Sequence, residues 1–132
     1  MKTITRFFLL ILPFVLCFCS KDEDSDLPPF ETIITQGTWI VSAYSEAGVN
    51  KTANYTGNTL KFNTGGTLTA TKGTDTFSGN WSIFSSTRTL TFTIGTFDVA
   101  LLALNGDWTV TSATLTDVQF VDGMDNLTLH KQ

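Results

Sequence analysis

Apolar and polar residues alternate with a period of two along most of the chain after residue 36. In the clearest stretch, residues 88–94, Leu90, Phe92 and Ile94 are separated by threonines. Successive side chains of a β-strand point to opposite faces, so this pattern predicts strands with one buried face. We predict seven to eight short strands, covering residues 39–44, 60–63, 67–71, 76–83, 88–94, 108–112, 114–121 and 126–130.

Turn-forming residues separate these segments. Residues 64–66, 72–74 and 122–125 each contain glycine among small or polar residues, which is typical of tight turns between neighbouring strands. Strands joined in this way pair in sequence order as an up-and-down meander. An open sheet would leave two unpaired edges, so closure into a small antiparallel barrel is favoured. The predicted fold class is therefore all-β, with the barrel domain over residues 30–132.

Four segments of this domain interrupt the alternation. Residues 30–35 are expected to form a short helical turn packed against the barrel through their apolar side chains. Residues 46–58 are mostly polar and are interpreted as a long loop, and residues 105–107 as a turn. Residues 97–104 are largely apolar at consecutive positions. A stretch this short is compatible with either a buried strand or a short helix, and periodicity does not decide between them.

The first residues of the chain follow a different pattern. An apolar run of 12 residues extends from Phe7 to Phe18, and the basic residues Lys2 and Arg6 precede it. A helix of that length rises only ~18 Å, which is short of the ~30 Å hydrocarbon core of a bilayer. A positive flank followed by a short apolar core predicts a signal peptide over residues 1–18.

The segment that follows this run resembles bacterial lipoproteins of the Bacteroidota, in which cysteine, serine, lysine and acidic residues begin many mature chains. The resemblance implies that Cys19 carries diacylglycerol and palmitate and anchors the chain in the outer membrane. Phe18 is larger than the residue that usually precedes a lipidated cysteine, and Cys17 is the alternative site. The resemblance also implies a signal for display on the outward face of that membrane, formed by Ser20, Lys21, Asp22, Glu23 and Asp24.

Residues 19–29 are interpreted as an extended, disordered linker, since acidic residues and a proline pair do not bury apolar area. Whether its acidic run is an export signal or only a solvated tether stays open. The chain has 8 basic and 12 acidic residues, and loss of Lys2 and Arg6 with the signal peptide leaves 6 against 12, a net charge of −6. Such a charge argues against nucleic-acid binding.

The two cysteines, Cys17 and Cys19, are too close in sequence to pair without strain, and no cysteine follows them. The domain must therefore be stabilised by a packed core rather than by a disulfide. We expect it to be a monomer.

All three tryptophans stand two residues after a glycine, in Gly37-Thr38-Trp39, Gly79-Asn80-Trp81 and Gly106-Asp107-Trp108. The favoured interpretation is that large rings fill the barrel, and the alternative is that they wall a ligand site. Together with residues 60–70 and 125–129, these motifs resemble the small lipocalin-like domains of Bacteroidota lipoproteins. The resemblance extends from about residue 36 to the C-terminus. It implies a lipocalin-like barrel but does not identify a ligand.

No catalytic or metal site is expected. His130 is the only histidine, and it alternates with inward-facing leucines, so it should point to solvent. The domain has no cysteine for a transition metal, and residues 122–126 lack the acidic spacing of a calcium loop. We therefore expect neither an enzyme nor a cofactor.

Two functions remain open. In the first, the barrel binds a small apolar ligand, which the family resemblance favours. In the second, its interior is filled and its loops contact a protein or a glycan, which the small size of the domain favours. A cavity lined by the large rings would support the first function, and a filled interior would support the second. The candidate ligand or core residues are Trp39, Phe62, Trp81, Phe92 and Trp108.

Overall fold

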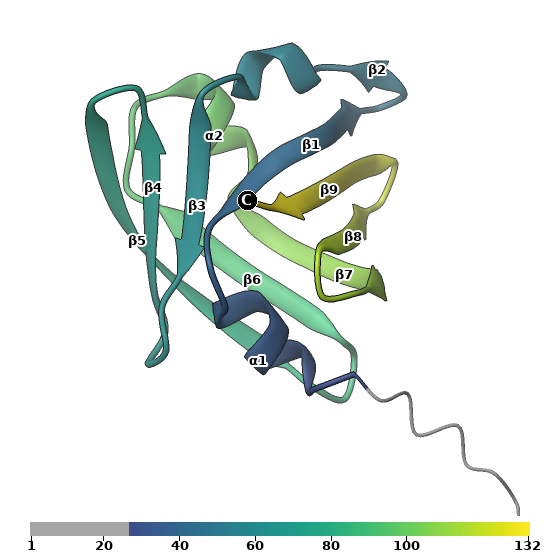
Figure 1. Ribbon diagram of the computed structural model, residues 1–132. Coiled ribbons are helices and arrows are strands. Elements are labelled where there is room, and N and C mark those ends of the chain that lie inside the picture. Colours follow the sequence, from purple (N-terminus) through teal and green to yellow (C-terminus); the bar gives the residue numbers. More distant parts are fainter. Residues whose placement is uncertain (1–26) are drawn as a thin grey trace, which may run out of the picture.

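The computed structural model describes residues 27–132, which fold into one antiparallel sheet closed as a barrel (Figure 1). Its strands are β1 (Trp39–Glu46), β2 (Val49–Asn50), β3 (Asn58–Phe62), β4 (Thr67–Lys72), β5 (Asp75–Phe84), β6 (Thr89–Ile94), β7 (Gly106–Ala113), β8 (Asp117–Asp122) and β9 (Asp125–Lys131). The helical elements are α1 (Phe30–Thr35), the 3-10 helix η1 (Thr52–Tyr55) and α2 (Val99–Ala103).

Pairing follows the order of the chain. Strands β3 to β8 each pair with the next strand, β3 also pairs with β1, and β9 pairs back with β1 to close the barrel. The β1–β9 register runs from Trp39 opposite Lys131 to Ser45 opposite Asn126. Eight strands thus form the barrel and the two-residue β2 lies beside β1. The predicted all-β, up-and-down antiparallel barrel is confirmed, at the upper end of the predicted strand number.

The period-two pattern places one apolar row of each strand inside the barrel. On β6, Leu90, Phe92 and Ile94 are almost fully buried, whereas the threonines between them are more exposed. The Phe62 ring meets Trp81 and Phe92 edge to face, with ring centroids 5.9 Å apart in both pairs. Aromatic pairs in this geometry add about 0.5–1.5 kcal/mol each to the free energy gained by burial.

Helix α1 covers one end of the barrel, as the apolar residues of this segment predict. Ile33 and Ile34 are buried, and the carbonyl of Ile34 accepts a hydrogen bond from Trp39 Nε1 at 2.9 Å. Figure 1 shows α1 at one end of the barrel and α2 at the other. Because α1 directly follows residues 27–29, the chain preceding the barrel joins it at the α1 end.

Helix α2 resolves the ambiguity of residues 97–104 in favour of a helix. Asp98 caps its first turn, with Oδ1 accepting a hydrogen bond from the Leu101 amide at 3.0 Å. Leu101 and Leu104, three residues apart, are fully buried on its inner face. The carbonyl of Leu104 accepts a hydrogen bond from Trp108 Nε1 at 2.8 Å, which ties the end of the helix to β7.

Three predicted boundaries are wrong in detail. The loop expected over residues 46–58 contains β2 and η1, because Tyr55 supplies a buried ring that folds this segment onto the barrel. In the turn expected over residues 105–107, Gly106 and Asp107 already belong to β7. There Asn105 Oδ1 accepts a hydrogen bond from the backbone amide of Ile94, and Asn105 Nδ2 donates one to the Ile94 carbonyl. These two bonds continue the pairing between β6 and β7. The strand expected from residue 114 begins at Asp117, since Thr114 forms a turn with it.

The predicted signal peptide and the lipidation site Cys19, with its alternative Cys17, lie outside the described residues, as do Ser20, Lys21, Asp22, Glu23 and Asp24. Among residues 27–132, no helix is long and apolar enough to cross a membrane.

Candidate functional site

The five aromatic candidates from the sequence lie in the core of the barrel. Their side chains are at most 6% exposed, and they are Trp39, Phe62, Trp81, Phe92 and Trp108. The ring N–H of each tryptophan donates to a backbone carbonyl of the protein, at 2.8–2.9 Å. Their polar atoms are therefore satisfied within the fold, and these residues act as packing residues in this structure.

Four hollows, of about 480, 430, 370 and 160 Å³, indent the described part of the chain. None of the four has any of these five aromatic side chains in its wall. The rings instead contact one another and their buried neighbours in one continuous hydrophobic cluster. The geometry therefore supports a filled interior, which directs the search for a site to the ends and the seams of the barrel.

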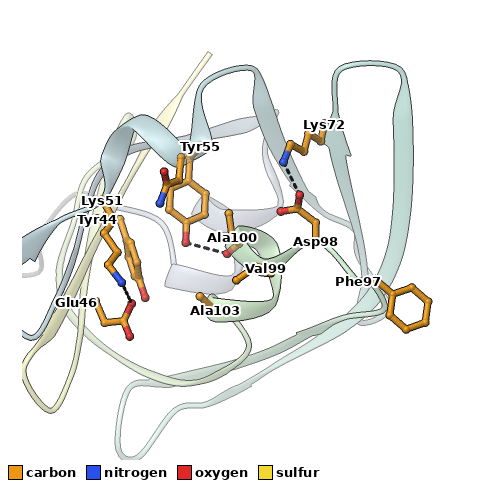
Figure 2. Close-up of a pocket in the computed structure, with 11 residues that line it drawn as sticks. Tyr44, Glu46, Lys51, Tyr55, Lys72, Phe97, Asp98, Val99, Ala100 and Ala103 are labelled. Carbon is orange, nitrogen blue, oxygen red and sulfur yellow. Dashed lines mark hydrogen bonds and ion pairs between the residues drawn. The ribbon is translucent and has the colours of Figure 1, made fainter.

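The hollow of about 480 Å³ lies at the α2 end, between η1 and α2 (Figure 2). We call it the end hollow. Tyr44 and Tyr55 meet edge to face in its wall, with ring centroids 5.2 Å apart. The Tyr55 hydroxyl donates to the carbonyl of Ala100 at 2.8 Å, which links η1 to α2. The remaining side chains around it are Glu46, Lys51, Asn54, Lys72, Phe97, Asp98, Val99 and Ala103.

The charged residues around the end hollow are paired with each other. Lys51 Nζ lies 2.7 Å from Glu46 Oε2, and Lys72 forms an ion pair with Asp98 (Figure 2). The hydrogen bond from Lys72, together with that from the Leu101 amide, lowers the pKa of the Asp98 carboxyl. Asp98 thus remains ionised at neutral pH and serves both as the helix cap and as one half of the ion pair.

The two tyrosines of the end hollow are held in their neutral form. Burial is the main cause that raises the pKa of both phenols, and negative charge at Glu46 adds to the effect. This shift moves Tyr44 and Tyr55 further from neutral pH, so neither acts as a base there. Both phenols therefore carry their protons at neutral pH.

Exposed apolar side chains surround α2. Phe97, Val99 and Leu102 are 102%, 80% and 49% exposed. Figure 2 shows the Phe97 ring turned away from the end hollow. We call these three residues the α2 patch. The sequence did not reveal it, because residues 97–104 are apolar without a clear period. The useful signal was Asp98 as a helix cap, since a helix starting there buries Leu101 and Leu104 and leaves Val99 and Leu102 exposed.

Two further exposed apolar residues lie at the same end of the barrel. Val49 on β2 is 58% exposed and Met124 in the β8–β9 turn is 75% exposed. The adjacent turns of the two segments are joined by the Ala47 amide, which donates to Asp125 Oδ1 at 2.9 Å. The end of the barrel opposite α1 therefore carries most of the large apolar side chains that the described chain exposes.

The structure places the histidine considered for catalysis on the outside of the barrel. His130 is exposed, as its place in the strand predicted, and its Nδ1 lies 2.8 Å from Asp117 Oδ1. Hydrogen bonds from His130 and Thr116 lower the pKa of the Asp117 carboxyl. Within residues 27–132, no group of three or more histidine, cysteine, aspartate or glutamate side chains is arranged to hold a metal ion.

One buried polar residue was missed by the sequence patterns. Asn58 begins β3 and faces inward with Leu60 and Phe62, at a position where the alternation requires an apolar residue. It is 2% exposed, and its Oδ1 and Nδ2 have no hydrogen-bond partner within the described chain. A buried polar group left unpaired costs about 1–3 kcal/mol of folding free energy. Asn58 lines the hollow of about 430 Å³.

Neither the protein-family models nor the curated protein sequences with which the chain was compared match it. The chain is similar in structure to a DUF4847 family protein from Bacteroides vulgatus, with a TM-score of 0.58 and 15% identity over 77% of this chain and 98% of that chain. For a lipocalin-like protein from Bacteroides uniformis, the TM-score is 0.57 and the identity 14%, over 74% and 98% of the two chains. An uncharacterized protein from Bacteroides eggerthii matches with a TM-score of 0.53 and 10% identity, over 73% and 98%. These likenesses concern the fold alone, and they confirm the lipocalin-like barrel that the sequence motifs implied.

Proposed function

We propose that this protein is a lipid-anchored protein of the cell envelope, displayed on the outer membrane, whose filled barrel holds a protein-binding surface away from the lipid. The anchor is Cys19, at the end of the apolar run, and the residues after it carry the export signal. The binding surface is the α2 patch. The observation that carries the binding proposal is the exposure of Phe97 and Val99 at the end of the barrel opposite α1.

The orientation of the barrel relative to the membrane follows from the end at which the linker joins it. The linker enters at α1, so the α2 end is the part of the barrel farthest from the attachment point (Figure 1). An extended linker of residues 20–29 spans ~30 Å at ~3 Å per residue. The α2 patch would then be presented to molecules outside the membrane rather than to the lipid that holds Cys19.

The chemistry of the α2 patch favours a protein over a glycan. Burying an exposed phenylalanine, valine or leucine side chain contributes about 1.5–3 kcal/mol each, provided that the partner surface is also apolar. Hydroxyl groups of a glycan would lose water at this surface without gaining hydrogen bonds from it. The nearest charged pair, Lys72 with Asp98, is already satisfied internally.

Site-specific photo-cross-linking in intact host cells tests this function. A benzophenone amino acid at Phe97 should give a discrete adduct, and the same group at Gln119, exposed on the side of the barrel, should not. Adding Leu102→Asp to the Phe97 reporter should abolish the adduct, because it places a charge within the contact. Equal adducts from both positions, or an adduct that survives Leu102→Asp, would refute the α2 patch as a specific surface.

Binding of a small apolar ligand is the second candidate function, and the end hollow favours it. Tyr44, Val99, Ala100 and Ala103 supply apolar wall, and the volume of about 480 Å³ lies within the range of ~300–1,000 Å³ that small-molecule sites occupy. The binding position moves from the interior expected from the sequence to the end of the barrel. Saturable quenching on titration with a fluorescent fatty-acid analogue, lost in Ala100→Trp, would support it.

A further inference from the structure

The hollow of about 370 Å³ lies at the α1 end of the barrel, between the start of α1 and the turn that joins β5 to β6 (Figure 1). We call it the α1 hollow. The residues around it are Pro29, Phe30, Glu31, Ile83, Ser85, Arg88 and Val110. It shares no wall residue with the end hollow. A site here is therefore separate from the α2 patch, and it requires no lipid at Cys19.

One part of the α1 hollow is apolar. Val110 is 3% exposed, and Phe30 and Ile83 are partly buried against the hydrophobic core. The Phe30 ring meets Phe120 edge to face, with ring centroids 6.3 Å apart. Because these side chains come from α1, β5 and β7, three elements of the fold fix this part of the wall. An apolar group of a ligand would be stabilised by burial against it.

Arg88 has a backbone conformation that is unfavourable for its residue type. Its φ is 54°, in the left-handed region that glycine adopts without steric cost. The turns before β5 and before β9 place glycine at such positions, Gly73 and Gly123. The Arg88 carbonyl accepts a hydrogen bond from the Val110 amide at 2.9 Å, which holds this conformation. An arginine at a position suited to glycine indicates that its side chain has a use.

Arg88 and Glu31 border the same hollow without forming an ion pair. The ion pairs within residues 27–132 are Lys51 with Glu46, Lys72 with Asp98, and His130 with Asp117. Both Arg88 and Glu31 are exposed, so a solute can reach them. Opposite charges that border one hollow and do not meet leave room for a molecule that carries both an anion and a cation.

From this arrangement we propose that the α1 hollow binds a free α-amino acid with an apolar side chain. The carboxylate of the amino acid accepts hydrogen bonds from the Arg88 guanidinium, whose planar fork offers parallel N–H donors. Its ammonium group donates to the Glu31 carboxylate, and its side chain packs against Phe30, Ile83 and Val110. The volume of about 370 Å³ lies within the range of ~300–1,000 Å³ that small-molecule sites occupy.

Other small molecules match only part of this wall. The carboxylate of a fatty acid would pair with Arg88 but would face the like charge of Glu31. An uncharged apolar molecule would remove water from both charged groups without replacing it by a partner. A zwitterionic lipid headgroup carries both charges, but its apolar part stays in the membrane. An amino acid carries the anion, the cation and the apolar group on one carbon atom, as a wall with all three kinds of contact requires.

Ligand-observed saturation-transfer NMR on the full-length protein, purified in mild detergent, tests the proposal. The probes are L-leucine, L-methionine and L-phenylalanine, with glycine as the analogue that lacks an apolar side chain. For the amino acid that binds most tightly, the amide derivative removes the negative charge and the N-acetyl derivative removes the positive charge. We expect saturable binding of at least one amino acid and about tenfold weaker binding of glycine and of both derivatives, since each lacks one contact.

Two variants assign the charged contacts. Arg88→Gly removes the guanidinium and suits the backbone, so it should weaken binding by about tenfold without lowering the melting temperature. Glu31→Gln removes the negative charge and should weaken binding to a similar extent. Arg88→Gly should not affect the amide derivative, and Glu31→Gln should not affect the N-acetyl derivative. The control Lys61→Gln removes an exposed cation on β3 and should leave binding unchanged.

Absence of saturable binding by all of these amino acids would overturn the proposal, as would unchanged affinity in both Arg88→Gly and Glu31→Gln. Glycerophosphoethanolamine carries the two charges of a zwitterionic lipid headgroup. Its binding without binding of any amino acid would overturn the assignment of the ligand as an amino acid.

Discussion

Replacing Trp108 tests whether the interior of the barrel is a packed core. Trp108 is 2% exposed, its ring meets Tyr44 at 6.3 Å between centroids, and its N–H bonds the carbonyl of Leu104. Trp108→Ala removes the ring and leaves a cavity, which costs about 3–5 kcal/mol in protein cores. It also leaves the Leu104 carbonyl without the hydrogen bond that joins α2 to β7.

The expected shift in melting temperature follows from the size of the domain. A change of 1 kcal/mol moves the midpoint by roughly 4–8 °C in domains of 60–100 residues, so Trp108→Ala should lower it by roughly 12–40 °C. A domain with about 5–15 kcal/mol of total stability could be largely unfolded by this change at growth temperature. Trp108→Phe keeps most of the packing and removes the N–H, so it separates the two contributions and should cost less.

Circular dichroism melts measure these midpoints without relying on tryptophan emission. The matched control is Phe97→Ala, which removes an aromatic ring of full exposure and should change stability by less than about 0.5 kcal/mol. A Trp108→Ala protein that melts with the wild type would refute a packed interior. In that case the ring would be available to a ligand, and the first of the two sequence-based functions would be favoured.

Four further predictions concern the anchor, the tether, the helix cap and the buried Asn58. Cys19→Ser should abolish labelling with palmitate and release the protein from membranes, and continued labelling would contradict the assignment. Replacement of residues 21–24 by alanine should preserve lipidation but protect the protein from protease added to intact cells, whereas unchanged cleavage would reduce this run to a tether. The folded-state pKa of Asp98 is lowered, so its ion pair with Lys72 stabilises the fold above the unfolded pKa and loses that effect as the pH falls through the folded pKa. Asp98→Asn keeps a cap but not the charge, so its melting midpoint should lie below that of the wild type at about pH 7 and approach it at about pH 2. Asn58→Leu should raise stability by about 1–3 kcal/mol, measured by urea unfolding, and a loss of stability would show that its amide is paired in solution.

The closed barrel was predictable because the alternation is strong and the turns are short. On β4 and β6 each inward position carries an apolar residue, as do Leu60 and Phe62 on β3, so the pleat fixes which face of these strands is buried. The helix at residues 99–103 could not be predicted from periodicity, because its length is little more than one turn. Its formation depends on the Asp98 cap and on burial of Leu101 against the barrel, and the second contact is visible only in the fold.

The residues that the sequence singled out as ligand candidates were chosen for their size, and size also makes them suitable for the core. An eight-stranded barrel has an interior that side chains can just fill. With Trp39, Phe62 and Phe92 fully buried there, little space is left for a ligand between the strands. Two residues of the structure have the opposite properties: Phe97 is an apolar residue that is fully exposed, and Asn58 is a polar residue that is buried.

These two exceptions have different physical meanings. An exposed ring costs little in the folded protein, because it is equally exposed in the unfolded chain, so Phe97 can persist without any function. A buried amide without partners lowers stability directly, and replacement by leucine would remove that cost. Within the described chain, no group of the barrel bonds the Asn58 amide. For this reason the two exceptions should differ in their effect on stability: Asn58→Leu should change the free energy of unfolding by about 1–3 kcal/mol, whereas Phe97→Ala should change it by less than about 0.5 kcal/mol.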